Sequence, residues 1–246
     1  MARNKGSKKR VTGHRDKHRS VAIPTKRTFV YIDGFNLYYG IRDAELRRFL
    51  WLDVLKLANS FMQKDRVLSR TKYFTARIRG VNRRDTPDEA KARESSRLRQ
   101  KTYLEAVQSL PATDVIEGHF LWKNAKCGSC NSPNVSAEEK LTDVNIASEM
   151  LCDAFLGRFD LAIVVSGDSD LSPPIERIRQ HFPAKPVFVA FPPKRQSEQL
   201  KAVATSHFDI AEDRLRKCQF PDQLTLPSGV ILNRPKKWAP QPPGAA

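Results

Sequence analysis

Apolar residues recur along the chain with two different periods, which indicates that strands and helices alternate. Runs of strand length, such as 160–166, are separated by stretches whose apolar residues recur every three or four positions, such as 53–63. The pattern predicts strands over 28–33, 70–78, 114–121, 160–166 and 186–191, with one more ending at Ile210, and helices from Asn36 and over 53–63, 86–110, 142–157, 171–181 and 197–203. Such alternation favours a mostly parallel central sheet within a three-layer α/β/α sandwich.

Two of these predictions concern the position of a strand in the sheet and the buried face of a helix. The strand over 70–78 alternates in polarity, so we expect it near an edge of the sheet. The helix over 142–157, with Thr142 as its N-cap, should place its apolar residues inward, and Cys152 on the same face should be part of the core. The apolar residues concerned are Val144, Ile146, Ala147, Met150, Leu151, Ala154 and Phe155.

Charge divides the chain into three parts. Residues 1–27 hold ten of the 43 Lys and Arg residues and one of the 27 acids, so this arm carries +9 of a formal net charge of +16. We expect it to be disordered and to contact a polyanion, although a solubilising tail is the alternative. The folded domain is expected over 28–212, with an excursion around 121–138, and the proline-rich residues 213–246 are expected to form a strap or tail.

Composition limits the class of protein. A chain of 246 residues can bury one sizeable core, and 40% hydrophobic with 28% charged residues fits a folded domain with polar appendages. No apolar run suggests a membrane span or a signal peptide, so we expect a cytoplasmic protein without a membrane partner. Four scattered cysteines do not suggest a disulfide-linked secreted scaffold.

Acidic residues follow two of the predicted strands where each strand ends. Asp33 ends the first strand, and Asp168 and Asp170 follow the strand over 160–166. Acids at the carboxyl ends of parallel strands meet at one edge of the sheet, and converging carboxylates favour a hard divalent cation. Asp143, at the start of a helix, would join them, although the helix dipole alone would also favour an acid there. The glycines beside Asp33 and Asp168 do not form a dinucleotide-binding fingerprint.

Three segments carry a resemblance to a known family. They are Tyr31-Ile-Asp-Gly-Phe-Asn-Leu-Tyr38, Glu139-Lys-Leu-Thr-Asp-Val144 and Val165-Ser-Gly-Asp-Ser-Asp-Leu-Ser-Pro173. In order and spacing they are similar to the NYN domain family of the PIN-like nuclease superfamily, over roughly residues 28 to 190.

The resemblance implies a PIN-like fold and metal-dependent endoribonuclease chemistry with Mg²⁺ or Mn²⁺. It implies that Asp33, Asp143, Asp168 and Asp170 are metal ligands, and that Asn36 hydrogen-bonds an acid or the scissile phosphate. The bound metal would activate water and offset charge on the phosphate. Ser166 could donate to the phosphate or cap its turn.

Basic residues mark a candidate surface for RNA, single-stranded or structured. Between residues 66 and 101 twelve Lys or Arg stand against four acids, and Tyr73, Phe74 or Tyr103 could stack on bases. The alternative is a solvated helix face above core aromatic residues. The candidate contacts are Arg77, Arg79, Arg83, Arg84 and Arg97, with Lys194 and Arg195 after the strand over 186–191.

Cys127 and Cys130 have the spacing of half a zinc site, but no second such pair exists in the chain. A second subunit in a homo-oligomer could complete a Zn²⁺ site, and a loop of reduced thiols is the favoured alternative.

Two other functions compete with the ribonuclease hypothesis. One is an RNA-binding regulatory module without turnover, and the other is a different activity on the same scaffold, such as hydroxylation of a pyridine compound. The intact acids argue against the first alternative, because binding a polyanion alone would favour their replacement.

Overall fold

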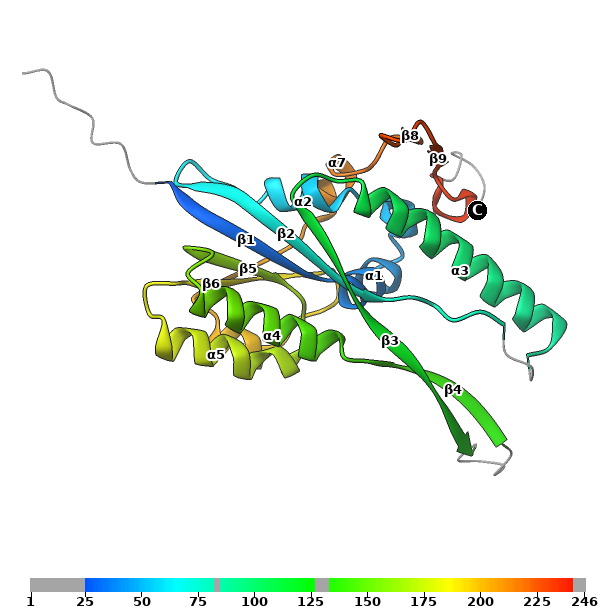
Figure 1. Ribbon diagram of the computed structural model, residues 1–246, viewed down its shortest axis with the longest axis horizontal. Helices are drawn as coiled ribbons and strands as arrows, with labels where there is room; N and C mark the ends of the chain where they lie inside the picture. The colour runs from blue at the N-terminus through cyan, green and yellow to red at the C-terminus, as the bar shows by residue number, and fades with distance from the viewer. Residues whose placement is uncertain (1–24, 82–84, 127–132, 241–246) are drawn as a thin grey trace, which may run out of the picture.

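The computed structural model describes residues 25–81, 85–126 and 133–240, with the backbone alone for 121–139. Within these residues, seven strands form one sheet in the order β4-β3-β2-β1-β5-β6-β7 (Figure 1). The strands are β1 (Lys26–Asp33), β2 (Arg66–Ala76), β3 (Thr113–Lys126), β4 (Pro133–Lys140), β5 (Leu161–Val165), β6 (Val187–Phe191) and β7 (Ser206–Asp209). Neighbours pair in parallel except β3 and β4. The mostly parallel sheet predicted from the sequence is confirmed.

Helices cover both faces of this sheet and enclose two apolar cores. Alternate residues of β1 point to opposite faces, so Val30 and Ile32 belong to one core and Tyr31 to the other. The first core is closed by α1 (Gly34–Asp43), α2 (Val54–Asn59) and α3 (Pro87–Gln108). The second is closed by α4 (Thr142–Phe155), α5 (Ser172–His181) and α6 (Glu198–Val203). The predicted three-layer α/β/α sandwich is therefore confirmed (Figure 1).

Strand β2 lies inside the sheet, so its predicted edge position is wrong. It pairs with β1 on one side and with β3 on the other. Lys72, one of the polar residues of this strand, is buried, and its ammonium forms ion pairs with Glu149 and Asp153 of α4. Because these acids balance its charge, a lysine can be buried at this position.

Strands β3 and β4 form an antiparallel hairpin that extends beyond the rest of the sheet (Figure 1). It occupies most of the predicted excursion, and β4 was not predicted. Cys127 and Cys130, the candidate half of a zinc site, fall between the two strands and outside the described residues.

Helix α4 buries a narrower face than its apolar pattern predicts. Ile146 and Met150 are fully buried, but Val144 is 58% and Phe155 77% exposed. Cys152 is also exposed, so its predicted place in the core is wrong. The helix is oriented instead by Asp153, which is fully buried and accepts a hydrogen bond from Tyr31 Oη at 2.7 Å. Leu141, with φ of 75°, precedes this helix as the N-cap in place of Thr142.

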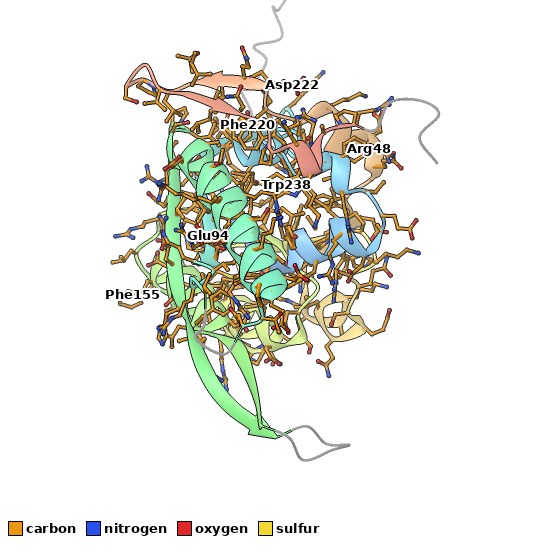
Figure 2. All side chains as sticks on the ribbon, turned by 90° about the vertical axis from the view of Figure 1, so that its right-hand side faces the viewer. Arg48, Glu94, Phe155, Phe220, Asp222 and Trp238 are labelled. Carbon is orange, nitrogen blue, oxygen red and sulfur yellow. The ribbon has the colours of Figure 1, made fainter. Side chains whose placement is uncertain are left out.

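Residues 212–238 fold against the first core. They contain α7 (Glu212–Lys217), the hairpin β8 (Gln223–Thr225) and β9 (Ile231–Asn233), and the short turn η3 (Lys236–Trp238). Trp238, labelled in Figure 2, is buried. Its ring centroid lies 5.9 Å from that of Tyr103 on α3. Trp51 donates from Nε1 to the Pro221 carbonyl at 2.7 Å. The segment predicted as a strap or tail is thus anchored by two tryptophans.

No helix among the described residues is long and apolar enough to cross a bilayer.

Candidate active site

Asp33 lies at the junction of β1 and α1 and is only 4% exposed. Its carboxylate caps the helix, because Oδ1 accepts a hydrogen bond from the backbone N–H of Asn36 at 2.9 Å. Oδ2 accepts a second bond, from Ser166 Oγ, also at 2.9 Å. Both carboxylate oxygens are therefore held in place by the chain itself.

The turn after β5 is tied to the end of β1 by side chains. Ser166 Oγ accepts from the backbone N–H of Asp168 at 3.0 Å while it donates to Asp33, so it both caps the turn and contacts the acid. The Asn36 side chain accepts from the Gly167 N–H at 2.8 Å. Because β1 and β5 are adjacent and parallel, these bonds fix two strand ends against each other.

Two glycines allow the backbones to approach closely here. A Cβ on Gly167 would lie 2.6 Å from the Arg195 carbonyl oxygen, and one on Gly34 would lie 2.6 Å from the Phe74 carbonyl oxygen. Neither distance accommodates a carbon atom, so any side chain at these positions would displace the backbone.

Asp143 completes the group from a third element, the first turn of α4. The acidic cleft, a cavity of about 210 Å³, is lined by Asp33, Phe35, Asn36, Tyr39, Asp143, Asp168 and Arg195. Three of the four predicted acidic ligands therefore line one cleft. Asp170 is exposed outside this lining, but its charge contributes to raising the pKa of Asp143.

Burial and the neighbouring negative charges raise the pKa values of Asp33 and Asp143. Burial raises the pKa of Asp33 to about 6, and the charges of Asp143 and Asp168 act in the same direction, against the bonds from Asn36 and Ser166. The pKa of Asp143 is raised by burial and then by the charges of Asp168 and Asp170. Arg195 lines the cleft, but its guanidinium pairs with Asp43 at 2.5 Å.

The donor set fits a hydrated divalent cation. In the part of the chain that the structure describes, no three His, Cys, Asp or Glu groups lie close enough to enclose a metal ion. Mg²⁺, however, keeps several water ligands and commonly takes only one or two carboxylates directly. Buried acids with raised pKa values are the groups that a hydrated cation would stabilise in the ionised form.

The basic residues predicted to contact RNA differ in their surroundings. Arg77 pairs with Glu117, and Arg97 with Glu94, each at 2.6–2.7 Å, while Arg79 and Lys194 are exposed. Arg83 and Arg84 lie outside the described residues. The three aromatic residues that could have stacked on bases, Tyr73, Phe74 and Tyr103, are buried, so that prediction is wrong.

Sequence reasoning missed the aromatic residues that do line the cleft. Phe35 and Tyr39 are one helical turn apart on α1, and their ring centroids are 6.2 Å apart with nearly parallel planes. The Arg42 guanidinium lies 4.5 Å from the Tyr39 ring centroid. Their four-residue spacing directly after Asp33 was the available signal, because it places both on the helix face next to that acid.

The fold and this cleft define an α/β/α domain with an acidic site at the carboxyl ends of its parallel strands. Residues 27–211 match the NYN domain, and the chain belongs to this family. The resemblance found in the sequence is confirmed. The family places the chain within the PIN-like nuclease superfamily, whose NYN members are typically nucleases that bind RNA and use divalent metals.

Two individual proteins are similar to this chain. The chain is 28% identical over 249 residues to the 6-hydroxy-3-succinoylpyridine 3-monooxygenase HspA of Pseudomonas putida (strain DSM 28022 / S16), covering 88% of this chain and 76% of that protein. It also resembles the crystal structure of VPA0982 from Vibrio parahaemolyticus RIMD 2210633, a protein of unknown function. That match has a TM-score of 0.49 and 20% identity and covers 79% of this chain and 98% of the other.

Proposed function

We propose that this protein is a metal-dependent endoribonuclease that hydrolyses phosphodiester bonds of RNA at the acidic cleft. The observation that carries the proposal is the convergence of Asp33, Asp143 and Asp168, from three different elements, on one cavity. Family membership supports this reaction class, and the acidic cleft is the location that we propose for it.

Asp33, Asp143 and Asp168 would hold an Mg²⁺ or Mn²⁺ ion, and Asp170 would act from the rim through bound water. When bound, the ion would lower the pKa of a coordinated water and offset charge developing on the phosphate.

The rest of the site holds these acids in position. Ser166 and the backbone of Asn36 hold both oxygens of Asp33, so its carboxylate need not reorient when it binds a cation. With a pKa of about 6, Asp33 is mainly ionised at neutral pH and loses its charge in mildly acidic solution. Cation binding should therefore weaken as the pH falls through about 6.

Positive charge outside the cleft supports a polyanionic substrate. The formal net charge is +16, and the exposed side chains of Arg79 and Lys194 are free to contact phosphates in solution. The basic arm is a further candidate contact.

The test is cleavage of labelled single-stranded RNA with Mg²⁺, with Mn²⁺ and with chelator. We expect wild type to cut in either metal, Asp33→Asn and Asp168→Asn to lose cleavage, and Asp88→Asn to retain it, because Asp88 is an exposed acid at the start of α3. Cleavage that survives Asp33→Asn or Asp168→Asn would refute the proposed site. Binding of RNA without cleavage in either metal would instead support a regulatory RNA-binding module.

A second candidate function is hydroxylation of a pyridine compound, favoured by the 28% identity to the Pseudomonas monooxygenase across most of the chain. The discriminating assay incubates the protein with 6-hydroxy-3-succinoylpyridine, a nicotinamide or flavin reductant and oxygen. Substrate-dependent oxygen consumption, with no RNA cleavage in parallel samples, would replace the nuclease proposal.

A further inference from the structure

A second cavity, the aromatic pocket, adjoins the acidic cleft. It measures about 270 Å³, and its walls include the rings of Phe35, Tyr39, Tyr73, Tyr103 and Trp238. Phe35 and Tyr39 line both cavities, so the pocket and the cleft meet along α1. A mainly apolar pocket of this size, with several aromatic rings and a few polar groups in its wall, suits one flat ring system.

Polar side chains in the pocket wall already form hydrogen bonds within the protein. Gln100 accepts from the Ile78 N–H at 2.7 Å and donates to the Ala76 carbonyl at 2.9 Å, which fixes the end of β2 against α3. Tyr103 Oη donates to the Leu52 carbonyl at 3.0 Å. These contacts make the wall rigid, and they leave recognition of a ligand to other side chains.

The wall contains two arginines, and Arg42 pairs with Asp43, whereas Arg99 is bonded differently. Its guanidinium bonds only the hydroxyl groups of Ser95 and Ser96, at 2.6 and 2.8 Å. The other two arginines of α3, Arg93 and Arg97, pair with acids. Within residues 25–81, 85–126 and 133–240, Arg99 has no acidic partner, although it is half-buried at the pocket. A guanidinium in this setting is complementary to an anionic group on an aromatic ligand.

We propose that the aromatic pocket binds one nucleotide of the substrate, with its base against the accessible rings of Phe35 and Tyr39 and a phosphate at Arg99. This inference deepens the proposed function, because each nucleotide of RNA lies between two phosphates. With one phosphate in the acidic cleft, the other is available to Arg99 while the base enters the pocket between them. A paired and stacked base cannot enter, so the substrate at the cut site is single-stranded.

The experiment measures binding rather than cleavage, by isothermal titration calorimetry of the full chain with UMP, AMP, ribose 5-phosphate and benzoate. We expect UMP or AMP to bind more tightly than either ribose 5-phosphate, which lacks a base, or benzoate, which lacks ribose and phosphate. Arg99→Met should weaken nucleotide binding by about tenfold, because it removes a charge-assisted contact. Arg177→Met is the matched control, since it removes an exposed arginine of α5, outside the pocket and on the other face of the sheet, and it should bind as wild type does.

The two proposals can fail separately. Asp168→Asn should lose cleavage but keep nucleotide binding. If wild type cuts RNA but Arg99→Met binds nucleotides as well as Arg177→Met does, the pocket proposal is wrong and the nuclease stands. If nucleotides bind with the expected dependence on Arg99 and no RNA is cut, the nuclease proposal fails alone. Equal or tighter binding of ribose 5-phosphate or of benzoate would overturn the nucleotide assignment.

Discussion

Replacing Asp33 by Asn should stabilise the metal-free protein at neutral pH, although it should abolish cleavage. The Asp33 carboxylate is buried, and its pKa of about 6 lies well above the ordinary value of 3.8. A difference of about two units corresponds to roughly 3 kcal/mol, since each unit is worth about 1.4 kcal/mol. At pH 7 the folded protein therefore carries an unfavourable charge that Asn does not have.

The sign of the pH dependence follows from the direction of this shift. Because the folded-state pKa of Asp33 is raised, the folded protein binds the proton more tightly than the unfolded chain does. The stability from this group is fully present below pH 3.8 and is lost as the pH rises through about 6. Asp33→Asn should remove that loss, so its advantage over wild type should grow between these pH values. For a domain of this size, up to about 3 kcal/mol corresponds to an increase of up to roughly 6–12 °C in Tm.

The assay is thermal unfolding followed by circular dichroism between pH 4.5 and 8, in chelator and again with Mn²⁺. Asp88→Asn is the control for loss of one exposed negative charge. In Mn²⁺ the wild type should gain stability and Asp33→Asn should gain less. The reasoning is refuted if Asp33→Asn in chelator is less stable than wild type at pH 7.5, or if the difference between them does not change with pH.

Three further predictions concern other parts of the fold. Lys72→Met removes one of the two cations that pair with the buried Asp153 and leaves the other, Arg158. It should lower the free energy of unfolding by less than the roughly 3–5 kcal/mol typical of an uncompensated buried charge. Denaturant titration would measure this, with partial recovery in Lys72→Met/Asp153→Leu, and an unchanged midpoint for the single variant would contradict it. Gly167→Ala should greatly reduce cleavage, because its Cβ would lie 2.6 Å from the Arg195 carbonyl oxygen. If the variant cleaves RNA at the wild-type rate, the close approach of the turn after β5 to Arg195 is not required for activity. Deleting residues 1–24 should reduce the slope of log RNA affinity against log salt concentration by about 0.7 for each phosphate contact that is lost. An unchanged slope would show that the arm does not contact the RNA.

The layers of the fold and most of the acidic set could be predicted because they depend on local pattern. The period of the apolar residues predicts the order of strands and helices. Acids that follow parallel strands, such as Asp33 and Asp168, are expected to meet at one edge of the sheet. The interior position of β2 could not be predicted, because Lys72 is buried only through acids distant in sequence. The same contact with Asp153 determines which face of α4 packs inward. Arg99 could not be recognised as a candidate ligand-binding residue either. Only the structure shows that Arg97 pairs with Glu94, whereas Arg99 bonds two serine hydroxyl groups.

The attachment of the basic arm has a consequence for how RNA would reach the cleft. Lys26 and Arg27 were predicted to belong to the arm but are the first two residues of β1, which shortens the arm to residues 1–24. Arg27 bonds Asp160 and the Gly157 carbonyl, and this holds the pKa of Asp160 at about 2. This anchor is at the amino end of β1, whereas Asp33 is at the carboxyl end. The strand has eight residues, so the two ends are about 25 Å apart. An arm of 24 residues can extend at most roughly 80 Å, enough to reach past the whole strand. The arm would then act as a tether that raises the local concentration of RNA from the opposite rim, and a change in its length should alter the rate of capture more than the choice of cut site.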